Sequence, residues 1–81
     1  MPSKLGEIKS QALGHLDTLE SQAKKAASTR GGLTEGDKDR IKDAKDAINQ
    51  SSLARDAEQS AKMAIEEISK LVQQILHRSE K

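Results

Sequence analysis

Apolar residues recur at intervals of three or four positions from residue 5 to residue 26. This interval keeps them on one side of an α-helix, which is the pattern of an amphipathic helix with one buried face. The members of this first stripe are Leu5, Ile8, Ala12, Leu16, Leu19, Ala23 and Ala26. We predict a helix over residues 3–29, with Ser3 as its N-cap.

A glycine pair follows this helix and indicates where it ends. Gly31 and Gly32 can take the left-handed backbone conformation that closes a helix C-terminus. Thr34 has the side chain of an N-cap, and Asp37, three residues later, approximates a capping box. We therefore predict a break over residues 30–34 and a second helix that begins at residue 35.

The apolar face changes direction near residue 50. Ile41, Ala44 and Ile48 form a second stripe, but its continuation at helical spacing falls on polar residues. A third stripe begins at Leu53 or Ala54 and continues to residue 76. At 100° per residue, the apolar face turns by about 140° between the second stripe and the third.

Two architectures are compatible with this turn. A break at residues 49–52, with a serine as the next N-cap, gives helices over about 35–49 and 52–77, a frayed tail at 78–81 and a small antiparallel bundle. Without the break, one helix of about 43 residues, roughly 64 Å long, pairs with the first helix as a hairpin. We favour three helices over two, and in both cases residues 1–81 form a single all-α domain.

The core that such a fold can bury is small. Hydrophobic residues make up 33% of the 81 residues, ten of them are alanine, and no residue is aromatic. Seventeen large apolar side chains remain, and each stabilises a fold by about 1.5–3 kcal/mol when fully buried. We expect a monomer of marginal stability, without the roomy apolar pocket of an enzyme.

The charges are numerous and balanced, with 14 basic and 13 acidic residues. Lysine and aspartate alternate from residue 37 to residue 46, which is typical of a solvated helix face, whereas nucleic-acid binders cluster their basic residues. We do not expect nucleic-acid binding, although a small helical DNA-binding or regulatory protein is a further alternative. The chain has no cysteine and no apolar run long enough for a membrane span or a cleavable signal peptide. We expect a soluble protein without disulfides, cytoplasmic or exported by a route without such a signal.

The residues that usually carry chemistry are isolated from one another. His15 and His77 have no second ligand at a metal-binding spacing, and no serine lies in a glycine elbow. His15 lies beside the first stripe, where we expect a partly buried structural side chain, and His77 suits a helix C-terminus. We predict no catalytic, cofactor-binding or metal-binding residues, no cofactor and no small-molecule substrate, so the protein is not expected to be an enzyme.

The third stripe is the broadest apolar surface, and it is the candidate interaction face. Its members are Ala57, Ala61, Ala64, Ile65, Ile68, Leu71, Val72, Ile75 and Leu76. Most of them are expected to form an internal core, but the arc is wider than packing on one neighbour requires. We predict a non-enzymatic protein–protein interaction or assembly module that binds a protein partner or self-associates through this face as an oligomer, in the manner of a coiled coil.

Ten positions between residues 48 and 76 carry residues that recur in one known family. They are Ile48, Asn49, Leu53, Asp56, Ile65, Glu67, Ile68, Val72, Gln74 and Leu76. At these positions the chain resembles the C-terminal helix of type III secretion needle subunits, although it lacks the proline-containing turn and the aromatic residues of that family. The resemblance implies a self-polymerising subunit of an export needle, or a small helical chaperone of such subunits.

Overall fold

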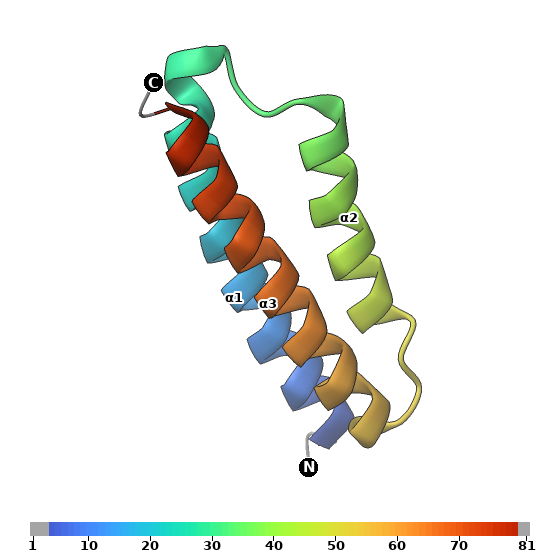
Figure 1. Ribbon diagram of the computed structural model, residues 1–81. Helices are drawn as coiled ribbons and strands as arrows, with labels where there is room; N and C mark the ends of the chain where they lie inside the picture. The colour runs from blue at the N-terminus through green and yellow to red at the C-terminus, as the bar shows by residue number, and fades with distance from the viewer. Residues whose placement is uncertain (1–3, 80–81) are drawn as a thin grey trace.

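Three helices form an elongated bundle in the computed structural model, which describes residues 4–79 apart from the side chains of Arg30 and Ser79 (Figure 1). Helix α1 (Lys4–Ala27) continues into the short 3-10 helix η1 (Ser28–Arg30), and α2 (Glu35–Asn49) and α3 (Ala54–Ser79) follow. Successive helices run in opposite directions, so α1 and α3 are parallel to each other. The bundle measures 48 × 19 × 16 Å. The prediction of a small all-α bundle with three helices is confirmed.

The connection between α1 and α2 has the geometry that its sequence predicts. Gly31 and Gly32 have φ values of 91° and 104°, and the Gly32 amide donates to the Ala27 carbonyl at 3.0 Å. The Asp37 amide donates to Thr34 Oγ1 at 3.1 Å, and the Thr34 amide donates to Asp37 Oδ2 at 3.3 Å. This reciprocal pair is a capping box, which satisfies two amides at the start of α2.

The ends of the other helices differ from the prediction. The first helix ends at Ala27 and is followed by η1, and α3 begins at residue 54 rather than 52. Ser51 does not cap α3, because its hydroxyl donates back to the Ala47 carbonyl at 3.0 Å and so extends the end of α2. Ser3 and residues 80–81 lie outside the described part of the chain.

Helix α3 also continues past its predicted end at residue 77 and includes Arg78 and Ser79. In the structure these two residues continue the helix rather than form a separate tail. Arg78 Nη2 lies 3.7 Å from Oδ1 of Asp37, which is buried at the start of α2. This ion pair between two helices gives the last turn of α3 a partner within the bundle.

The three predicted stripes meet in one core. Helix α3 packs mainly against α1 and also along α2, while α1 and α2 contact each other less. The largest fully buried side chains are Leu16 of α1, Ile41 and Ile48 of α2, and Ile68 and Leu71 of α3. All three helices therefore bury their apolar faces within a single chain, as interdigitated side chains of a bundle do.

Candidate interaction surface

The candidate interaction face of α3 lies mostly inside the bundle. Seven of its nine members are buried against the same chain. They are Ala57, Ala61, Ala64, Ile68, Leu71, Val72 and Ile75. In this fold those side chains are core, because α1 and α2 cover two adjacent sides of the arc. The width of the arc thus reflects packing against two neighbouring helices rather than one.

The other two members, Ile65 and Leu76, reach the surface along the edge of α3 that borders α1. Ile65 is half-buried and Leu76 is 48% exposed. They lie eleven residues apart, which is about three helical turns, and so share one side of the helix. Ile8 and Ala26 of α1 are half-buried along the same border. We call these four residues the α1/α3 face.

Two shallow hollows lie along this face. One, of about 300 Å³, lies between Ile8, Ala12, Ala61 and Ile65, and His15 and Glu58 form part of its rim. The other, of about 380 Å³, lies near the opposite end of the helices. Its lining residues are Gln22, Lys25, Ala26, Val72 and Leu76. Each hollow therefore combines apolar side chains from both helices with one charged residue at its margin.

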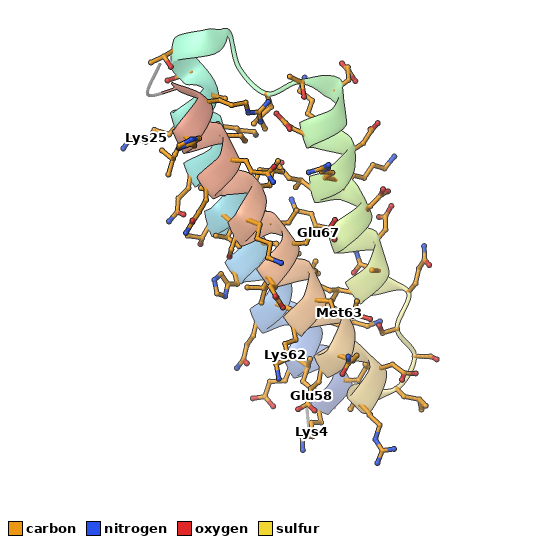
Figure 2. The ribbon with its side chains drawn as sticks, in the orientation of Figure 1. Lys4, Lys25, Glu58, Lys62, Met63 and Glu67 are labelled. Atoms are coloured by element: carbon orange, nitrogen blue, oxygen red, sulfur yellow. The ribbon has the colours of Figure 1, made fainter. Side chains whose placement is uncertain are left out.

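A different surface lies on the side of α3 that faces α2. Figure 2 shows Met63 and Glu67 on this side, and Met63 is 60% exposed. A hollow of about 270 Å³ borders them, lined on the α2 side by Arg40, Asp43 and Ala47. Its hollow is lined by three charged residues, whereas each hollow of the α1/α3 face has one. Within residues 4–79, Met63 and Leu76 are the large apolar side chains that are exposed on a helix.

The described histidines are both exposed. The prediction of a partly buried His15 is wrong, because its position one residue before Leu16 directs it to the rim of the hollow rather than into the core. His77 lies in the last turn of α3, next to the negative end of the helix dipole. Among residues 4–79, no group of three His, Asp or Glu side chains is arranged to hold a metal ion.

The buried carboxylate of Asp37 has contacts that serve the fold. It accepts the capping bond from Thr34 and faces Arg78, and the hollow of about 330 Å³ beside it also contacts Gly32 and Ile75. These contacts join the start of α2 to the end of α3.

No described helix is long and apolar enough to cross a membrane.

The spacing of apolar residues placed Ile65 and Leu76 on an interaction face but Ile8 and Ala26 only in the stripe of the first helix. Ile8 and Ala26 differ from their neighbours in their angular position around the axis of α1. Both lie to the same side of the fully buried residue Leu16 on a helical projection, and His15 and Gln22 lie on that side as well. Residues at the margin of a stripe are the ones that border a neighbouring helix.

No family model matches the chain, and no curated protein or solved structure shows significant similarity to it. The resemblance to type III secretion needle subunits therefore stays a prediction from the sequence.

Proposed function

We propose that the protein is a non-enzymatic interaction module whose α1/α3 face binds an amphipathic helix of a partner protein. The observation that carries this proposal is the exposure of Leu76, which is 48% accessible on a regular helix and lies in line with Ile65. A large apolar side chain held on a rigid helix loses little conformational freedom when a partner covers it. Such side chains are typical anchors in helix recognition.

The dimensions of the α1/α3 face suit a helix as the ligand. Ile8 and Ala26 are eighteen residues apart on α1, so the face extends over roughly 27 Å at 1.5 Å per residue. This length corresponds to about five turns of a partner helix. Two parallel helices provide a channel between them, and apolar residues of a third helix at i, i+4, i+7 and i+11 fit such a channel.

The charges at the margins give the partner helix a direction. Lys25 borders the hollow at one end of the face, and Glu58 borders the hollow at the other. A partner helix with a carboxylate near Lys25 and a basic side chain near Glu58 would form an oppositely charged pair at each end. Exposed pairs of this kind contribute mainly to orientation and association rate, and less to affinity.

Site-specific photocrosslinking tests the proposal in the cells that make the protein. A photoreactive amino acid at position 76 is expected to give one discrete protein adduct. The same group at position 63 is the matched control, because Met63 is 60% exposed on the other side of α3; it is expected to give none. Adducts of equal yield at both positions would indicate nonspecific crosslinking and contradict the proposal.

A second arm tests the apolar contact itself. With the photoreactive group at position 22, on the rim of the hollow, the substitution L76E should abolish the adduct, because a carboxylate in an apolar contact is costly to desolvate. The matched substitution M63E should leave the adduct unchanged. An adduct that survives L76E would exclude Leu76 as an anchor.

A further inference from the structure

The two connections between the helices are encoded very differently. Gly31 and Gly32 have positive φ values between α1 and α2, a conformation that other residues adopt at a cost. The connection between α2 and α3 contains neither glycine nor proline, and neither residue occurs anywhere from position 37 to position 79. The first connection is thus a fixed stop, whereas nothing in the backbone chemistry of the second prevents a helix.

The geometry of the second connection is close to helical. Gln50 has φ −78° and ψ −13°, and its amide donates to the Asp46 carbonyl at 2.8 Å, as in an α-helix. The Ser51 amide donates to the Ile48 carbonyl at 3.2 Å, and the first helical bond of α3 joins the Ala57 amide to the Leu53 carbonyl at 2.9 Å. The helix is therefore interrupted only over residues 51–53.

We propose that residues 51–53 are a hinge, and that the chain also forms a dimer with a second copy of itself by exchange of α3. In this dimer the hinge is helical, α2 and α3 form one continuous helix, and α3 of each chain packs against α1 and α2 of the other. The proposal concerns the core of the bundle, so it goes beyond the proposed function of the α1/α3 face.

The contacts divide clearly between the two chains of such a dimer. The contacts of Lys45 with Asp17 and Glu20 join α1 to α2 and stay within one chain. The contacts of α3, including the Arg78–Asp37 ion pair, form between chains. The core contacts between the helices are kept, which is the general reason why exchange of an element is an accessible route to dimers.

Two features of the chain favour the dimer over a simple opening of the bundle. The apolar face turns between α2 and α3, and the exchanged arrangement tolerates this turn because each half of the continuous helix belongs to a different bundle. Leu53 is 63% exposed in the monomer. Both hinges pass between the same two bundles in the dimer, so the two Leu53 side chains come into the same region.

Refolding from denaturant at increasing protein concentration, followed by size-exclusion chromatography with light scattering, measures the dimer. Dimer is expected to appear as concentration rises. A54P should abolish it, because proline suits the first residue of α3 but breaks a continuous helix. E35P is the matched control at the first residue of α2, outside the hinge, and should leave the dimer fraction unchanged.

Two further variants keep the result decisive if A54P does not fold. S52A, at an exposed hinge position, should raise the dimer fraction because alanine favours helix. L76E should leave the dimer fraction unchanged, because exchange of α3 does not use the exposed Leu76 side chain. A dimer formed through the α1/α3 face would instead be lost in L76E. The proposal would be overturned if the protein stays monomeric at every concentration or if the dimer survives A54P. It would also be overturned if S52A leaves the dimer fraction unchanged or if L76E abolishes the dimer.

Mixed chains identify the exchange directly. In a chain with D37R, positions 37 and 78 are both basic, and in a chain with R78D both are acidic. Each chain therefore brings like charges together when α3 packs within its own chain. When the two are refolded together, only exchange of α3 pairs opposite charges at both sites. Heterodimer in excess of both homodimers supports the hinge, and a statistical mixture or separate monomers would overturn it.

Discussion

Lys45 shows how one side chain can join two helices. Its Nζ lies 2.9 Å from Asp17 Oδ1 and 2.9 Å from Glu20 Oε1. The hydrogen bonds to Glu20 and then to Asp17 raise the pKa of the Lys45 ammonium above its ordinary value. These partners are distant in sequence, because α2 returns alongside α1. Spacing within a helix indicates the neighbours one turn away but not the residues that face it from another helix.

This contact predicts a pH-dependent contribution to stability. K45M should lower the free energy of unfolding at pH 7 by about 0.5–1 kcal/mol, the usual worth of partly exposed ion pairs. The pKa of Lys45 is higher in the folded state than in the unfolded state, so its contribution is complete below about pH 10 and is lost as the pH rises through the folded-state pKa.

Urea denaturation at pH 7 and above pH 11 measures this difference. The gap between the wild-type protein and K45M should shrink at the higher pH. K42M is the control on the exposed side of the same helix and should cost less at pH 7. A gap that stays constant with pH would mean that the charge of Lys45 does not carry its contribution to stability.

At the scale of elements, the sequence predicted most of the fold. Periodic stripes favoured three helices over two, and the start of α2 could be predicted because Thr34 and Asp37 form a capping box that is local in sequence. The bounds of α3 were less predictable. Ser51 is a good N-cap by type but bonds backward to Ala47, and Arg78 is held in the helix by Asp37 from another element.

The candidate surface was less predictable than the fold, for a physical reason. A helix side that packs inside a bundle and a side that binds another chain require the same apolar spacing. Only the positions of α1 and α2 show that Ile68 is core and that Leu76 reaches the surface. The misplacement of His15 has the same origin, because a residue at the margin of a stripe is buried or exposed according to its neighbour.

The two kinds of glycine in the chain predict opposite effects of one substitution. G14A lies in the middle of α1, where an added Cβ meets nothing within 4 Å, and should stabilise the protein by about 0.5–1 kcal/mol. G31A should destabilise it by about 1 kcal/mol or more, because Gly31 has φ 91° and alanine is strained there.

Thermal denaturation followed by circular dichroism compares the two variants with the wild-type protein. The midpoint of G14A should rise and that of G31A should fall. A G31A protein as stable as the wild type would show that η1 ends without a left-handed residue. The stop between α1 and α2 would then not depend on its glycine pair.

The whole molecule is a short rod rather than a sphere. The Cα radius of gyration is 13.6 Å, whereas a globular chain of this length has about 12 Å. A continuous helix over α2 and α3 would be roughly 67 Å long, well beyond the 48 Å length of the bundle. Overall dimensions therefore distinguish the three-helix monomer from any form in which the hinge is straight.

Small-angle X-ray scattering of dilute, freshly purified protein measures these dimensions. The radius of gyration should lie slightly above 13.6 Å because the side chains and hydration shell also scatter, and the maximum dimension should be near 50 Å. Dilution should change neither value. A maximum dimension above about 65 Å in the dilute protein would favour the long hairpin over the bundle.

The parallel course of α1 and α3 has a mechanical consequence. The first residue of α1 and the last residue of α3 lie at opposite ends of the rod (Figure 1). Tension between these two points slides α1 and α3 past each other along their shared length, so their interlocked side chains must yield together. Tension applied between the end of α1 and the end of α3, which lie at the same end, peels the helices apart one turn at a time. The rod therefore resists stretching along its axis more than it resists splitting from one end.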